Sequence, residues 1–139
     1  MIGIVLVSHG PLAEGLKGAA EMIVGPQSRF LTVSMGAVAD LDELRAQIED
    51  AAGRVVDPSE GEKVLVLVDL MGGSPSNASA YLASTGTQVV CGVNLPMLLE
   101  VLMNREDMSV DSLAEFALHA GKDGIISLTQ ILIEAQNHP

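Results

Sequence analysis

The residues best suited to chemistry are a histidine, an aspartate and a glycine-rich turn that lie far apart in the sequence. His9 follows a short apolar run within MIGIVLVSHGPLAEG. Asp69 follows a second apolar run, and the stretch GGSP comes soon after it at residues 72–75. An imidazole supported by a carboxylate can act as a nucleophile, and main-chain amides at the start of a helix bind anions. The combination predicts a histidine that accepts a phosphoryl group and passes it on.

Each of these residues has a separate role in that chemistry. A hydrogen bond from Asp69 to one imidazole nitrogen of His9 would fix the tautomer and stabilise a positive ring. The other ring nitrogen is then free to attack. Gly72, Gly73 and Ser74 supply backbone N–H groups at a predicted helix N-terminus, with a hydroxyl nearby, and therefore predict an anion site. Uncharged donors stabilise a phosphoryl group in transfer without binding it too tightly for it to leave.

Alternating strands and helices must bring these residues together. β-Branched and apolar runs predict strands at residues 2–7, 30–33, 64–68 and 87–91, with a last short strand at 125–128. Helical patterns begin after His9, at Asp40, at Pro75, near Pro96 and at Ser109. This alternation predicts an α/β fold with a doubly wound, mostly parallel sheet and helices on both faces. The sheet order 2-1-3-4 would place Asp69 beside His9, at the edge where such folds bind ligands.

Length and composition limit the classes of function. The 139 residues, 48% apolar and 18% charged, predict one globular domain over residues 1–139. The net charge of −11 argues against nucleic acid and favours a partner with a basic surface. A metal site is not expected, because one histidine and one aspartate fall short of the ligands that zinc requires. The apolar N-terminal run is too short for a signal or membrane segment, which predicts a cytoplasmic protein.

Three stretches resemble a known family: SHG at residues 8–10, VDLMGGSPSNA at 68–78 and GVNLPML at 92–98. They closely resemble the IIA domain (EIIA) of the mannose family of the bacterial sugar phosphotransferase system, and the likeness covers nearly the whole chain. The resemblance implies phosphorylation of His9 at Nε2, with Asp69 bonded to Nδ1 and no cofactor. It implies a phosphoryl-binding site formed by Gly10, Gly72, Gly73 and Ser74.

The partners of the protein are implied by the same resemblance. His9 would take its phosphoryl group from the phosphohistidine of the carrier protein HPr and pass it to an EIIB protein. The acceptor would be a separate chain, since the sequence ends at Pro139, and the membrane components EIIC and EIID would take part only indirectly. The family is homodimeric, and the short last strand, antiparallel to the others, is exchanged between subunits. Met71 departs from relatives, which often carry an aromatic residue at this position.

Two other functions stay open on the sequence alone. The phosphotransfer subunit of dihydroxyacetone kinase uses the same kind of histidine, although the GGSP stretch argues against it. A regulatory module that binds an anion or a protein at the same crevice, with no role in transport, also fits the glycine-rich turn. His119 and His138 are predicted to be surface or core residues without a role in function.

Overall fold

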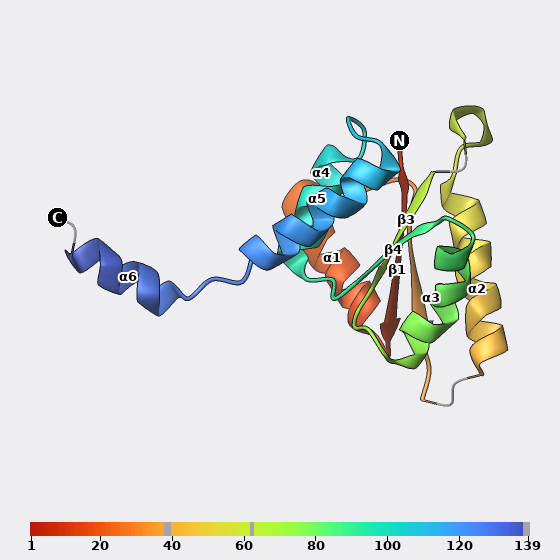
Figure 1. The fold of residues 1–139 in the computed structure, drawn as a ribbon, viewed down its shortest axis with the longest axis horizontal. Helices are drawn as coiled ribbons and strands as arrows, with labels where there is room; N and C mark the ends of the chain where they lie inside the picture. The colour runs from red at the N-terminus through yellow and green to blue at the C-terminus, as the bar shows by residue number, and fades with distance from the viewer. Residues whose placement is uncertain (38–39, 62, 138–139) are drawn as a thin grey trace.

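A four-stranded sheet forms the centre of the protein, whose computed structural model describes residues 1–37, 40–61 and 63–137 (Figure 1). The strands lie in the order β2-β1-β3-β4, and each neighbouring pair is parallel. Their bounds are β1 (Gly3–His9), β2 (Phe30–Met35), β3 (Val64–Val68) and β4 (Gln88–Cys91). The predicted α/β class and the predicted strand order 2-1-3-4 are confirmed.

Helices cover both faces of the sheet, which gives the three layers of a doubly wound fold (Figure 1). The helices on one face are α1 (Leu12–Val24), α4 (Leu95–Asn104) and α5 (Val110–Asp123). Those on the other face are α2 (Leu41–Val55), which is followed by the short 3-10 helix η1 (Pro58–Glu60), and α3 (Ser74–Ser84).

The two central strands are apolar on both sides because both sides are covered. In β1, Ile4 and Leu6 pack in the core beneath α1 and α4, whereas Val5 and Val7 pack against α2. All five residues of β3 are buried. A strand in this position has no solvent side, so it carries an uninterrupted apolar run instead of an alternating pattern.

Side-chain caps define where α2, α4 and α5 begin. Asp40 and Ser109, both predicted as caps, accept first-turn N–H groups of α2 and α5, and Asn94 does the same for α4. These bonds satisfy donors that a helix start leaves open. The helix predicted after His9 begins at Leu12, and α3 begins at Ser74, one residue before the predicted start at Pro75.

Arg105, the residue that caps the C-terminus of α4, forms hydrogen bonds at the amino-terminal edge of the sheet. Its side chain is almost fully buried, and its guanidinium donates four hydrogen bonds of 2.7 to 3.3 Å. The acceptors are the main-chain oxygens of Ile2, Ser28 and Arg29 and the side-chain oxygen of Gln27. They lie in the segments that lead into β1 and β2, so the buried cation ties α4 to both strands and is itself stabilised.

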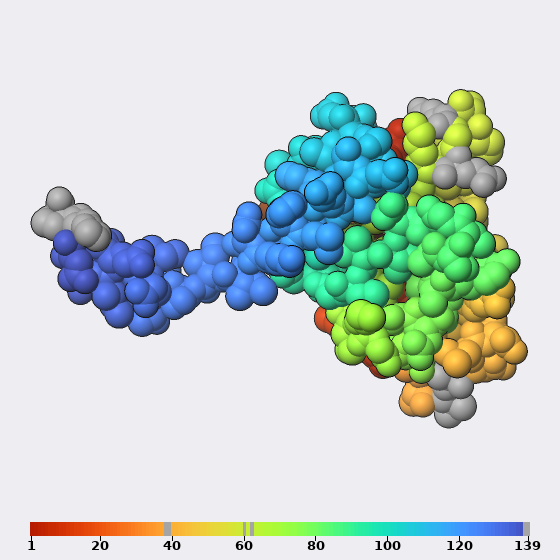
Figure 2. Space-filling view, viewed as in Figure 1, coloured from red at the N-terminus to blue at the C-terminus, as the bar shows by residue number. Residues whose placement is uncertain are grey.

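The C-terminal residues form an arm that stands clear of the three layers (Figures 1 and 2). The strand predicted at residues 125–128 is not formed in the single chain: residues 125–127 are irregular, and Leu128 begins α6 (Leu128–Asn137). A strand needs a neighbouring strand for its hydrogen bonds, and here the arm lies away from the sheet. None of the residues of α6 is buried. Within the described ranges, no helix combines the length and the apolar character needed to cross a membrane.

Candidate active site

His9 and Asp69 meet at the carboxyl-terminal edge of the sheet, as the strand order predicts. Nδ1 of His9 lies 2.7 Å from Oδ2 of Asp69, and the main-chain N–H of His9 donates to the same oxygen at 2.9 Å. The N–H of Leu70 donates to Oδ1 at 2.8 Å. The side chain of Asp69 is 5% exposed and that of His9 is 41% exposed. The carboxylate is thus a buried support, and the ring that it holds is accessible from outside.

These hydrogen bonds hold Asp69 in its charged form. Burial by itself raises the pKa of this carboxyl group, but the main-chain and ring hydrogen bonds from His9 and the N–H of Leu70 outweigh it. The pKa of Asp69 therefore lies below its ordinary value of 3.8. An ionised carboxylate only accepts hydrogen bonds, so Nδ1 of His9 carries the ring proton. The lone pair of Nε2 is then free, as a nucleophile requires.

The N-terminus of α3 lies against the His9 ring on the side of Nε2. A Cβ atom at Gly73 would lie 2.8 Å from Cε1 and 3.1 Å from Nε2 of His9, so a glycine is needed for this approach. Gly73 is also the N-cap of α3, and in the described chain no side-chain cap hydrogen bond closes this helix start. Open amides at the positive end of a helix dipole favour an anion, here one attached to Nε2.

Gly72 and Ser74 complete this helix start, whereas Gly10 serves the sheet. Gly72 has a φ of +93°, which favours glycine, and it turns the chain from Asp69 into α3. Ser74 is the first residue of the helix. Gly10 has a φ of +50°, and its N–H donates to the carbonyl of Met35 at 2.8 Å. The amide of Gly10 is therefore engaged within the protein, and the open amides come from the start of α3.

Ser8, the first residue of the SHG stretch, has no predicted role of its own and lies at the base of the turn that carries His9. Its hydroxyl accepts the N–H of Ala13 at 2.7 Å and donates to the carbonyl of Gly10 at 3.3 Å. The residue is 1% exposed. The sequence signal is a serine five residues before a helical position, which is not one of the usual capping spacings.

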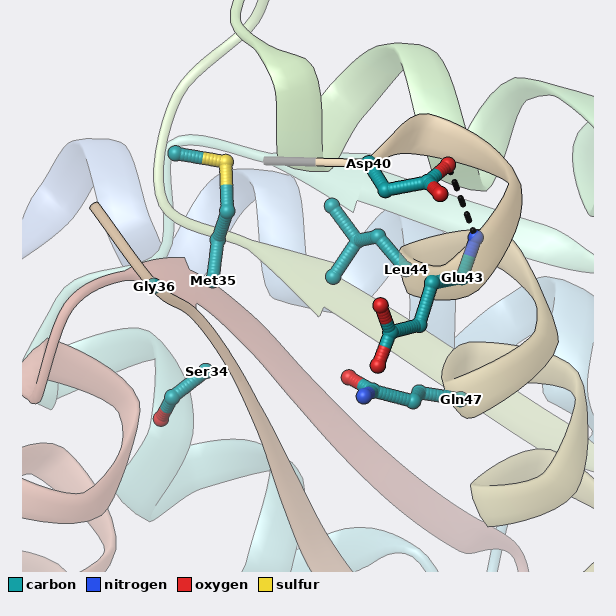
Figure 3. A pocket seen from close by; sticks show the side chains of 7 residues that line it. All are labelled: Ser34, Met35, Gly36, Asp40, Glu43, Leu44 and Gln47. Carbon is teal, nitrogen blue, oxygen red and sulfur yellow. Dashed lines mark hydrogen bonds between the residues drawn. The ribbon is translucent and has the colours of Figure 1, made fainter. Parts of the chain in front are cut away.

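A separate hollow of ≈ 230 Å³ lies beside the site, between the end of β2 and the start of α2 (Figure 3). Asp40 and Glu43 contribute carboxylates to its wall, and the Asp40 side chain accepts the N–H of Glu43 at 3.4 Å. Its other lining residues are Ser34, Met35, Gly36, Leu44 and Gln47, none of them basic. Carboxylates repel a phosphate group, so the N-terminus of α3 is a better binding site for a phosphoryl group than this hollow.

Other titratable groups do not form a second centre in the described ranges. In that part of the chain, no three His, Cys, Asp or Glu side chains are placed to hold a metal ion. His119, predicted to be a surface or core residue, is exposed on α5, and His138 lies outside the described residues.

Comparison with known sequences points to one family. The family model described as PTS system fructose IIA component, where PTS denotes the phosphotransferase system, matches residues 3–118. The PTS system sorbose-specific EIIA component of Lacticaseibacillus casei is 34% identical over 129 residues, which cover 91% of each chain. The PTS system mannose-specific EIIAB component of Escherichia coli K12 is 37% identical over 134 residues, or 91% of this chain and 39% of that longer protein.

Solved structures agree with the sequence matches. The phosphotransferase system component EIIA from Streptococcus agalactiae gives a TM-score of 0.83 at 27% identity, covering 94% of this chain and 99% of that chain. The mannose/sorbose-specific IIA subunit from Enterococcus faecalis gives a TM-score of 0.77 at 30% identity, covering 91% of this chain and 94% of that chain. The family match includes both sides of the candidate site, from His9 to the start of α3. The chain therefore belongs to the mannose-type EIIA family of the sugar phosphotransferase system.

Proposed function

We propose that the protein is a phosphoryl-carrier subunit of a sugar phosphotransferase system and that His9 carries the phosphoryl group. The observation on which the proposal depends is the bond between Nδ1 of His9 and Asp69, with Nε2 beside the uncapped start of α3. Family membership supports the role in sugar uptake, and this geometry supports a histidine nucleophile.

In the proposed transfer, the lone pair of Nε2 attacks the phosphorus of a phosphohistidine on HPr. An Nε2–P bond forms while the N–P bond of the donor breaks, and the electron pair of that bond returns to the donor imidazole. Asp69 stabilises the positive ring that forms on His9. The amides of Gly73 and Ser74 and the hydroxyl of Ser74 stabilise the phosphoryl oxygens, and Gly72 shapes the turn that presents them. The same steps in reverse pass the group to a histidine of EIIB.

We propose that both partners approach over the exposed face of His9. The exposed apolar residues Leu70 and Met71 directly follow Asp69 and support contact with a protein surface. The net charge of −11 supports a donor and an acceptor with basic surfaces. In this proposal residues 1–139 act as one cytoplasmic domain, and EIIC and EIID take part only indirectly.

We also propose a homodimer in which the C-terminal arm crosses to a second copy. β4 is an edge strand, and a groove of ≈ 600 Å³ runs along it between α3 and α5. The arm offers exposed apolar side chains to fill such a groove: Ile125, Ile126, Leu128, Ile131, Leu132 and Ile133. An unpaired strand edge beside an apolar groove favours the addition of a strand from another chain, here residues 125–128.

The proposal is tested by phosphorylation with phosphoenolpyruvate, enzyme I and HPr. We expect the intact mass to rise by one phosphoryl group, in an acid-labile form, and this gain to be absent in His9→Ala. Addition of candidate acceptors then identifies the pathway, because loss of label to EIIB supports sugar uptake and loss to a dihydroxyacetone kinase subunit supports that rival. A wild-type protein that stays unmodified would leave only an anion-binding or protein-binding module.

A further inference from the structure

We infer that Ser8 is a positioning residue for His9, because its buried hydroxyl holds the turn that aims the imidazole at α3. The expected effect of Ser8 on the rate of phosphoryl transfer rests on the proposed function. Ser8 directly precedes His9 and is 1% exposed, so it cannot contact a partner protein. Any effect of its hydroxyl on phosphoryl transfer must therefore pass through the histidine.

The hydroxyl bridges the two sides of the turn. Oγ accepts the N–H of Ala13, the second residue of α1, at 2.7 Å, and it donates to the carbonyl of Gly10 at 3.3 Å. A serine hydroxyl has one proton and two lone pairs, so both bonds form at once. His9 lies within the segment that these bonds enclose, and the direction in which its backbone leaves β1 is thereby fixed.

The other hydrogen bonds of the turn run to the β2 and β3 sides of the sheet and, from the Pro11 carbonyl, to the N–H of Gly15 in α1 at 3.0 Å. The main-chain N–H of His9 is bonded to Asp69 on the β3 side, and the N–H of Gly10 is bonded to Met35 in β2. Pro11 adds no donor, because it has no N–H. Ser8 supplies the side-chain link between the end of β1 and α1. Without it, a small rotation of the backbone would move Nε2 away from Gly73.

Two helix starts flank His9, those of α1 and α3. In α1, the N–H of Ala13 is already taken by Ser8. In α3, no side-chain cap hydrogen bond closes the first turn in the described chain. The helix start that faces Nε2 is that of α3, and an anion on this nitrogen would meet its amides.

The test compares Ser8→Ala, which removes the hydroxyl, with Ser8→Thr, which keeps it. We expect Ser8→Ala to accept the phosphoryl group from phospho-HPr at least about tenfold more slowly at saturating donor, because small misplacements of reacting groups are costly. The donor concentration for half-maximal rate should stay the same, since Ser8 does not reach the surface. Ser8→Thr should remain within about twofold of the wild type if orientation is what matters.

Ser109→Ala is the matched control. Ser109 also accepts a first-turn helix N–H, that of Ser112, but it caps α5 at a distance from the site. Its loss should lower stability and leave the transfer rate unchanged. Equal slowing in Ser8→Ala and Ser109→Ala would show a general effect of weaker folding and would overturn the inference. A Ser8→Ala protein with the wild-type rate would overturn it as well.

A second measurement separates this inference from the proposed function. Nitrogen-15 NMR of the unmodified protein reports which ring nitrogen of His9 carries the proton. We expect one tautomer, protonated at Nδ1, in the wild type and in Ser8→Thr, and averaged ring shifts with faster exchange of that proton in Ser8→Ala. If the wild type accepts no phosphoryl group, the proposed function fails while this comparison still decides the role of Ser8. Identical ring spectra in all three proteins would refute that role.

Discussion

At the scale of single residues, the site depends on a carboxylate that accepts three N–H groups. Oδ2 of Asp69 receives the ring and main-chain N–H groups of His9, and Oδ1 receives that of Leu70. An amide of the same shape cannot accept all three, because its NH₂ group would face an N–H in either orientation. It also lacks the charge that stabilises a positive ring.

Asp69→Asn should therefore slow phosphoryl transfer to His9 by about a hundredfold while the protein stays folded. The rate of label uptake from phospho-HPr measures this effect, and circular dichroism checks the fold. Asp57→Asn is the matched control, since Asp57 also accepts several hydrogen bonds but lies after α2, away from His9. A normal rate in Asp69→Asn would mean that another group orients the ring.

The stability supplied by Asp69 should depend on pH below about 4. Because the pKa of Asp69 in the folded protein lies below 3.8, its contribution is complete above pH 3.8 and is lost as the pH falls through the folded-state pKa. Urea unfolding of the wild type and Asp69→Asn between pH 7 and pH 3 measures the difference in free energy of unfolding. We expect a constant difference down to about pH 4 and a smaller one below it. A difference that grows in acid would contradict this assignment.

At the scale of elements, the approach of α3 to β1 sets the space around the His9 ring. Gly73 has ordinary extended backbone angles, so alanine is allowed there by conformation and is opposed only by the His9 ring. Gly73→Ala should displace that ring and slow phosphoryl transfer by about tenfold or more, with a change in stability below about 1 kcal/mol. Gly53→Ala is the control, because a Cβ there meets nothing within 4 Å and should raise stability by roughly 0.5 to 1 kcal/mol.

The four hydrogen bonds of Arg105 predict that its replacement lowers stability strongly and leaves phosphoryl transfer unchanged. Arg105→Met keeps much of the length but leaves four oxygens without their donor, so the free energy of unfolding should fall by roughly 2 to 4 kcal/mol. Urea unfolding measures the loss. Arg54→Ala, at an exposed pair 4.0 Å from Asp50, should cost about 0.5 kcal/mol or less. Equal losses in the two variants would show that the buried bonds contribute little.

The sequence predicts elements well where the pattern is local and poorly where contacts are distant. The apolar run of β3 and the caps Asp40 and Ser109 are local signals, and the pairing of His9 with Asp69 follows from strand order. Arg105 stands among polar residues, in the stretch NREDM, and its burial depends on oxygens more than seventy-five residues away. Ser8 and the absence of a strand at 125–128 likewise depend on which segments become neighbours in space.

At the scale of the whole molecule, the exposed arm and the open edge of β4 predict association. Leu118→Asp in the groove and Ile126→Asp in the arm should each convert a dimer into a monomer, because a buried unpaired carboxylate is costly. Light scattering over a range of concentrations measures the mass. Met22→Asp, which changes a still more exposed apolar residue on α1, should remain dimeric. A monomeric wild type, or variants that stay dimeric, would argue against exchange of the arm.

The His9 ring and the four hydrogen bonds of Arg105 lie at opposite ends of the strands. His9 can therefore be replaced without loosening the bonds that hold the other end of the sheet. An immobilised full-length His9→Ala protein should still bind the phosphoryl donor HPr but should accept no phosphoryl group from it. Such a protein would capture the phosphorylated donor intact for the lifetime of the complex.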